Sequence, residues 1–158
     1  MNDIVISNEL IINTPLNLVW YAWTIPERVC EWFAPEAMIE ATVGGAYELY
    51  FIHGNRIEMN TKGCKIIKLI DEKELQFTWK GPDQFKSIMN DENDLTIVNV
   101  SFESVNKDST RVVVEHIGFK DDDSWRDAID WHKMAWKGVL GSLMSALENG
   151  KGNLCCQP

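Results

Sequence analysis

The longest regular pattern in the sequence lies between Ser124 and Asn149. Apolar side chains recur there at intervals of three and four residues, so they share one face of a helix. These residues are Trp125, Ile129, His132, Trp136, Val139, Leu140, Leu143 and Leu147. Ser124 and Asp127 have the spacing of a capping box, and Gly150 supplies a stop. A helix of about 25 residues is roughly 37 Å long, so it needs an apolar surface of similar length to pack against.

The middle of the chain predicts that surface, because its apolar residues alternate with polar ones as they do in strands. The predicted strands cover residues 4–12, 38–42, 46–53, 57–70, 75–79, 96–103 and 110–117. The strand over residues 57–70 is expected to bend near Gly63. Short turns separate successive strands from residue 38 onward, so neighbouring strands pair antiparallel.

Two short helices are expected after the first strand. One covers Leu16–Thr24, and the second opens at Pro26 and ends before Pro35. The predicted fold class is therefore α+β: a curved antiparallel sheet of about six to seven strands grips the long C-terminal helix. We expect a single domain over residues 1–150 and a flexible tail over residues 151–158.

Composition disfavours several classes of function. The net charge of the 158 residues is −9, which disfavours binding to nucleic acid or to anionic membrane surfaces. No apolar run approaches the length of a membrane span, and the N-terminus does not look like a signal peptide. The four cysteines, at positions 30, 64, 155 and 156, lack metal-ligand spacing. We expect a cytoplasmic protein with no metal and no cofactor.

Strand periodicity predicts which side chains face the long helix, and most of them are aromatic. Three strands contribute inward rows, the two short helices contribute further rings, and the long helix closes the layer. The candidate cavity-lining residues are Trp20, Trp23, Trp32, Phe33, Tyr47, Leu49, Phe51, His53, Phe77, Trp79, Val114, His116, His132 and Trp136. Pockets for apolar ligands have such walls, with a few polar groups among them. A core filled by these side chains is the alternative.

The three histidines, His53, His116 and His132, are the only groups here that titrate near neutral pH. A histidine in a cavity could move a proton during catalysis, but packing roles explain the same residues. No nucleophile with an adjacent base and no phosphate-binding or dinucleotide motif is present. The catalytic residues, if the protein is an enzyme, are therefore unknown.

Several motifs, taken in order, resemble those of the SRPBCC (START-like) superfamily. They are the stretch from Asn13-Thr14-Pro15 to Pro35, Val43-Gly44-Gly45 before Tyr47, Leu75-x-Phe77-x-Trp79, Thr110 to Phe119, and Trp136 with Leu140, Leu143 and Leu147. Within the superfamily, the chain is most similar to the branch of the activator of heat-shock-protein-90 ATPase, over roughly residues 4–148. This resemblance implies a helix-grip fold with a cavity between sheet and helix, which other members use for lipids, sterols or polyketides.

Three functions remain open at this stage. The first is a binding protein for a small apolar or aromatic molecule, acting as a monomer or a homodimer. The second is an enzyme of the cyclase, dehydratase or hydrolase kind that uses His53 or His116 to move a proton. The third, which rests on fold analogy alone, is an interaction module that acts on a chaperone ATPase.

Overall fold

The computed structural model describes residues 4–150 and residue 152, so most of the predicted tail lies outside the described residues. Its strands are β1 (Ile4–Ile12), β2 (Glu36–Ile39), β3 (Tyr47–Ile52), β4 (Asn55–Asn60), β5 (Ile66–Ile70), β6 (Glu74–Trp79), β7 (Thr96–Asn106) and β8 (Ser109–Phe119). Its helical elements are α1 (Leu16–Thr24), α2 (Pro26–Val29), η1 (Asp83–Phe85), α3 (Lys86–Met89), η2 (Asp123–Trp125) and α4 (Arg126–Asn149).

The strands form two antiparallel sheets. The larger has the order β1-β8-β7-β6-β5 and the smaller has the order β2-β3-β4. An isolated bridge between Ala46 and Lys65 joins them. The predicted α+β class, with antiparallel strands and a long C-terminal helix, is confirmed. The expected single sheet is instead a pair of linked sheets, because the chain turns between β4 and β5.

That turn corrects the prediction of one long strand over residues 57–70. Asn60 ends β4, and its side-chain oxygen accepts a hydrogen bond from the backbone N–H of Lys62 at 3.0 Å. Gly63 follows with a φ of +91°, which an L-residue rarely adopts. The chain therefore leaves the three-stranded sheet and enters the other one at β5. Residues with strand character lie on both sides of the turn, so sequence periodicity did not separate the two strands.

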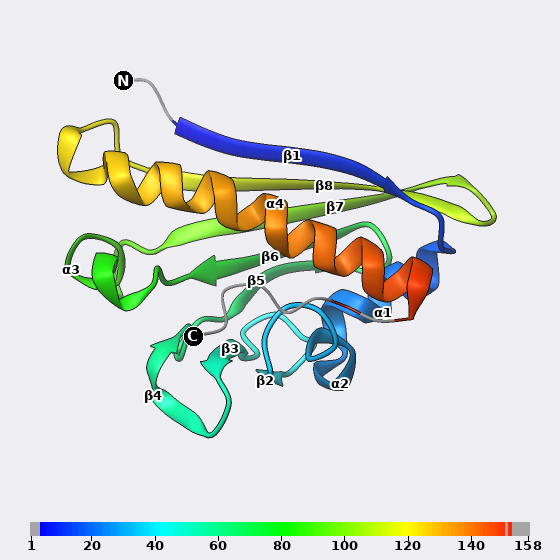
Figure 1. Ribbon diagram of the computed structural model, residues 1–158, viewed down its shortest axis with the longest axis horizontal. Helices are drawn as coiled ribbons and strands as arrows, with labels where there is room; N and C mark the ends of the chain where they lie inside the picture. Colours follow the sequence, from blue (N-terminus) through cyan, green and yellow to red (C-terminus); the bar gives the residue numbers. More distant parts are fainter. Residues whose placement is uncertain (1–3, 151, 153–158) are drawn as a thin grey trace.

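Helix α4 lies across one face of the five-stranded sheet, as the orange segment of Figure 1 shows. Its 24 residues end at Gly150, which has the left-handed φ of +76°. The predicted capping box is wrong, because the side chain of Ser124 does not cap the helix. Instead, the side chain of Asp122 accepts a hydrogen bond from the backbone N–H of Ser124 at 2.7 Å. This bond caps the short turn η2 at its start. Helix α4 begins after that turn, at Arg126, two residues beyond the predicted cap Ser124. Among the described residues, no helix is both long enough and apolar enough to span a membrane.

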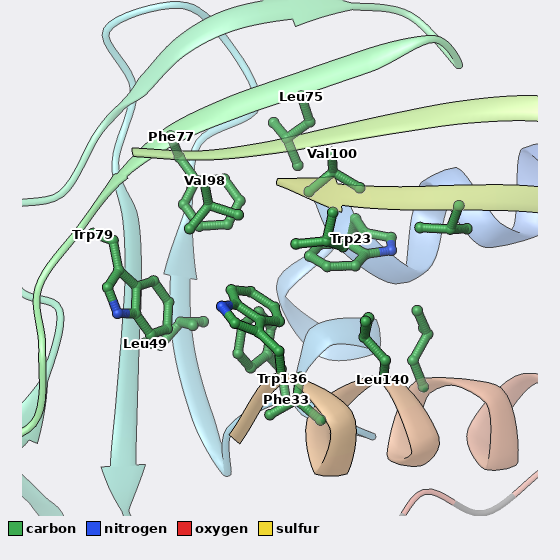
Figure 2. Close-up of a cluster of buried hydrophobic side chains, with 14 of the residues drawn as sticks. Trp23, Phe33, Leu49, Leu75, Phe77, Trp79, Val98, Val100, Trp136 and Leu140 are labelled. Carbon is green, nitrogen blue, oxygen red and sulfur yellow. The ribbon is translucent and has the colours of Figure 1, made fainter. Parts of the chain in front are cut away.

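The core between α4 and the sheet is dominated by packed rings (Figure 2). Trp32 and Phe33 stack with ring centroids 4.6 Å apart, and Phe33 also stacks on Trp79 at 6.0 Å. Tyr47 of β3 stacks on Phe77 of β6 at 4.0 Å, which ties the two sheets together. Rings from the segment after α2 and from strands β3 and β6 thus fill the space between the sheets and α4.

Candidate functional site

A pocket opens between the smaller sheet, β6 and the N-terminal half of α4. We call it the Trp79 pocket. It is lined by Phe33, Phe51, Met59, Asn60, Trp79, Lys80, Gly81, Pro82, Trp131, His132, Ala135, Trp136 and Val139. The volume open to the centre of a water-sized sphere is about 40 Å³, and about 560 Å³ of space surrounds it when the open mouth is included. The space of about 40 Å³ has room for about three water molecules.

Five of the fourteen predicted residues line this pocket: Phe33, Phe51, Trp79, His132 and Trp136. They come from four separate segments of the chain, which the fold brings together at one end of the aromatic core. Their exposed surface in the pocket is almost entirely carbon. Such walls suit an apolar ligand, and ligand binding by these residues stays a prediction.

Eight other predicted residues face inward but do not line the pocket. They are Trp20, Trp23, Trp32, Tyr47, Leu49, Phe77, Val114 and His116, and all are buried. Their side chains fill the space between the sheet and α4, and Figure 2 shows Trp23, Leu49 and Phe77 among them. The interior is therefore a packed core over most of the length of α4, and the Trp79 pocket lies at one end of it.

The placement of His53 on the inner face is wrong. Its side chain is 86% exposed, and its nearest ionic neighbour is Glu36, with 3.9 Å between Nδ1 and Oε2. Strand β3 ends at Ile52, and Gly54 turns the chain with a φ of +79°. The alternation that placed Tyr47, Leu49 and Phe51 inward therefore stops one residue before His53.

The other two histidines are buried and each is hydrogen-bonded to a tryptophan. The indole N–H of Trp136 donates to Nδ1 of His116 at 3.0 Å, and Nε2 of His116 contacts Oγ1 of Thr96 at 2.9 Å. The indole N–H of Trp79 donates to Nε2 of His132 at 3.2 Å. Nδ1 of His132 donates to the carbonyl oxygen of Ala128 at 2.7 Å. One nitrogen of each ring must be an acceptor, so both rings are neutral and the two tautomers differ.

Burial reinforces this neutrality. Desolvation, followed by repulsion from His132, holds the pKa of His116 well below its usual range. Desolvation lowers the pKa of His132 to about 4, and its bond to the carbonyl of Ala128 offsets only part of that effect. The ring centroids of the two histidines are 5.3 Å apart, so a charge on either would face the other. The Trp79 pocket therefore has an uncharged floor.

The same contacts bear on proton transfer. A general base needs a nitrogen lone pair within reach of the substrate. In both His116 and His132, a tryptophan N–H occupies that lone pair, and His53 lies on the surface. The geometry therefore gives no support to a catalytic histidine in this pocket.

Sequence reasoning missed the rim of the pocket, which is formed by the end of β4 and the loop after β6. The Lys80 ammonium contacts Glu92 and donates to the carbonyl of Lys62 at 2.6 Å. The backbone N–H of Met59, which has the unusual φ of +50°, donates to Asp83 at 3.2 Å. These bonds tie β4, the end of β6 and η1 together around the mouth. No signal in the sequence pairs these segments, because their contacts depend on how the two sheets are joined.

A second, larger hollow lies at the other end of α4. It has a volume of about 160 Å³ on the same measure, and its walls are Thr14, Leu18, Tyr21, Ala22, Arg28, Glu31, Trp32, Ala146 and Leu147. Its rim carries an ion pair, Arg28 to Glu31 at 3.5 Å. Volume favours this hollow, but its lining lacks the converging rings of the Trp79 pocket, so we regard the Trp79 pocket as the better candidate for an apolar ligand. In the part of the chain that the structure describes, no three or more His, Cys, Asp or Glu side chains cluster as metal ligands would.

A long C-terminal helix held against antiparallel sheets, with a pocket beside it, defines a helix-grip protein of the START-like class. Sequence comparison gives the family: residues 13–148 match the model of the Activator of Hsp90 ATPase homolog 1-like protein family, and the chain belongs to this family. No curated protein sequence was found to match it.

Solved structures show the same fold at low sequence identity. Protein MLL2253 from Mesorhizobium loti aligns with a TM-score of 0.73 and 20% identity, over 92% of this chain and 98% of that one. The Aha1 dimer from Colwellia psychrerythraea aligns with a TM-score of 0.72 and 22% identity, over 94% of this chain and 99% of that one. The HSP90 activator PFC0360w from Plasmodium falciparum aligns with a TM-score of 0.65 and 17% identity, over 92% of this chain and 97% of that one.

Proposed function

We propose that this protein binds a small, uncharged, apolar or aromatic molecule in the Trp79 pocket. The observation that carries the proposal is the pocket itself, where rings from α4, β6 and the segment after α2 converge on a neutral floor. A charged ligand would lose its hydration there without gaining a free partner, because the histidine nitrogens are hydrogen-bonded to tryptophans and the Lys80 ammonium at the rim is paired with Glu92.

The small volume of the pocket limits the ligand. A pocket with only about 40 Å³ open to the centre of a water-sized sphere cannot hold a sterol or a long acyl chain unless the surrounding side chains move. A single ring or a short alkyl chain that extends into the open mouth fits the dimensions better. Met59 at the end of β4 and Pro82 in the loop after β6 are then the first residues that a larger ligand would displace.

The uncharged dye N-phenyl-1-naphthylamine tests this proposal, since its fluorescence rises in apolar surroundings. We expect the dye to bind, and indole and 1-decanol to displace it. Decanoate should compete about tenfold less well than 1-decanol, because its carboxylate must be desolvated. No dye signal, or equal competition by decanoate and 1-decanol, would contradict the proposal.

A matched pair of variants on α4 locates the binding site. Ala135 is half-buried and lines the pocket, whereas the neighbouring Met134 is 76% exposed and does not. Ala135→Phe should fill the pocket and weaken dye binding by about tenfold or more, which corresponds to about 1.4 kcal/mol. Met134→Phe should leave binding unchanged. Equal effects of the two variants would assign the dye to another part of the surface.

Stimulation of a chaperone ATPase is the second candidate function. Membership of the family and the likeness to an HSP90 activator favour it, although the likeness to that structure concerns the fold alone. The test is the ATPase rate of a purified Hsp90 chaperone with and without this protein. Stimulation that persists in the Ala135→Phe variant would assign the activity to a surface other than the pocket.

The remaining expectations are part of the proposal. A cytoplasmic location is consistent with the free thiols at Cys30 and Cys64. The net charge of −9 disfavours a nucleic-acid partner. We propose that residues 1–150 act as one domain. Self-association is also proposed, since the similar structure from Colwellia psychrerythraea is described as a dimer.

A further inference from the structure

Strand β1 forms one end of the larger sheet and has an unusually unprotected edge. It pairs with β8 on one side, and no described strand pairs with its other side (Figure 1). Its nine residues, IVISNELII, contain no proline, no lysine and no arginine, and Glu9 is the one charged residue. Open backbone N–H and C=O groups along such an edge can pair with another strand, so natural proteins normally block them.

The other end strands of the two sheets carry the usual protections. Strand β5 is only five residues long, contains Lys68, and meets the smaller sheet at Lys65. Strand β2 has four residues. Strand β4 contains Arg56 and Glu58, and the φ of +50° at Met59 distorts its backbone. Among the strands that the structure describes, β1 alone combines length, apolar character and a free edge.

The pairing with β8 also leaves the backbone of β1 uninterrupted. Between Ile4 and Ile6 the register advances by two residues on β1 but by three on β8, from Phe119 to His116. The additional residue therefore belongs to β8, where Gly118 has a φ of +97°. A bulge in β1 itself would have blocked pairing, and none is present.

The residue pattern of β1 is symmetric about Asn8. If two copies of the strand pair antiparallel around this residue, Val5 of one faces Ile11 of the other, and Ser7 faces Glu9. Ile6 then faces Leu10, Ile4 faces Ile12, and Asn8 faces Asn8. Apolar side chains meet apolar ones and polar side chains meet polar ones at every position, as a two-fold interface requires. We propose that a second copy of this chain pairs with β1 in this register, which joins the two larger sheets into one.

Burial supports this occupant. Val5 and Ile11 are 45% and 46% exposed on the outer face of the sheet, and the pairing covers both. The register also avoids direct like-charge repulsion, because Glu9 faces Ser7 of the second copy rather than the other Glu9. Each Glu9 also keeps Arg111 of its own chain, with 3.8 Å between the nearest nitrogen and oxygen. The seam is about 30 Å long, from nine residues at roughly 3.3 Å each.

The interface is separate from the Trp79 pocket and does not depend on the proposed ligand. The pocket lies beside β6, and β7 and β8 separate β6 from β1. Dimer formation and dye binding can therefore be measured independently in the same samples.

Sedimentation velocity over a wide range of protein concentration tests the proposal. We expect a reversible monomer–dimer equilibrium for the wild-type protein. The double variant Val5→Lys/Ile11→Lys places lysine opposite lysine at two points of the seam. It should weaken the dimer about tenfold or more.

The variant Val5→Lys/Ile11→Glu changes the same two positions but places lysine opposite glutamate. It should retain at least about tenfold tighter association than the double-lysine variant. Ile57→Lys, at a 90% exposed site on β4, serves as the control that should leave the dimer intact. A wild-type protein that stays monomeric would overturn the proposal, as would equal dissociation, or equal persistence, of the dimer in the two double variants.

Discussion

The indole N–H of Trp136 on α4 donates to Nδ1 of His116 on β8, with 3.0 Å between the nitrogens. This bond crosses the core from the long helix to the strand next to the β1 edge of the sheet. A second bond of the same kind runs the other way, from the indole of Trp79 on β6 to His132 on α4. Two tryptophan–histidine pairs therefore fix the position of α4, and both leave their imidazoles uncharged.

Removal of one indole should expose the role of this arrangement. Trp136→Phe keeps a ring but deletes the N–H that His116 accepts, so a buried acceptor loses its partner. We expect a loss of about 2 kcal/mol in the free energy of unfolding, from the unpaired nitrogen and the space left by the smaller ring. The pKa of His116 should rise toward its ordinary value, because the lone pair of Nδ1 becomes free to bind a proton.

Urea denaturation measures the first effect, and NMR titration of the imidazole measures the second. Trp131→Phe is the control, since Trp131 also lines the Trp79 pocket from α4 but is only half-buried. That variant should leave the titration of His116 unchanged. A similar change in both variants would mean that the pKa of His116 does not depend on the bond from Trp136.

The neutral histidines also predict how stability depends on pH. The pKa of His132 is about 4 in the folded chain, against 6.5 for an ordinary histidine. Between these values the unfolded chain binds more protons, so the free energy of unfolding falls as the pH falls from 6.5 to about 4. The contribution of His132 is fully present above that window, and its loss amounts to on the order of 3 kcal/mol. His116 should act in the same direction.

His132→Gln tests this dependence, because glutamine does not titrate and its side-chain oxygen can still accept from Trp79. Urea denaturation at a series of pH values should show a shallower decline for the variant than for the wild type below pH 6.5. Carboxylates contribute to the decline in both proteins, so the difference between the two curves is the relevant quantity. Parallel curves would refute a depressed pKa for His132.

Sequence periodicity predicted the parts of this structure that repeat along the chain. The spacing of Trp136 and Leu140 identified α4, and the alternation at Phe77 and Trp79 identified the inward face of β6. These patterns reflect local geometry and burial together, so they are readable without knowledge of distant segments. The fold class followed from the same patterns.

The pocket was less predictable because it depends on relations between distant segments. Trp131 lies beside the apolar stripe of α4 rather than on it, so helical spacing gave no reason to include it. Pro82 comes from the loop after β6 and Met59 from the end of β4, and their approach depends on the junction of the two sheets. His53 was misplaced because a two-residue period does not reveal where a strand ends, although Gly54 was a signal for the turn.

Adjacent glycines before β3 should differ in their tolerance of a side chain. Gly44 has a φ of +86° with open space around its α-carbon, so Gly44→Ala costs only backbone strain, about 1 kcal/mol. A β-carbon at Gly45 would lie 2.2 Å from the carbonyl oxygen of Glu40. Backbone must move to relieve that overlap, so Gly45→Ala should cost about 3 kcal/mol. Thermal or urea denaturation of the two variants provides the comparison, and a smaller cost at Gly45 would contradict the close approach.

Two tyrosines of β3 offer a test of how the helical arm is attached to the sheet. The Tyr47 hydroxyl donates to the carbonyl oxygen of Trp23 in α1 at 2.7 Å, and both groups are buried. Tyr47→Phe leaves that carbonyl unpaired and should lower the free energy of unfolding by about 2 kcal/mol. The Tyr50 hydroxyl donates to the half-buried Glu48 at 2.6 Å, and Glu48 also accepts from the backbone N–H of Gly63, so Tyr50→Phe should cost less than about 1 kcal/mol. Hydrogen exchange should also quicken in α1 for the first variant alone. If Tyr50→Phe destabilised the protein as much as Tyr47→Phe, the bond from β3 to α1 would not be what holds the arm in place.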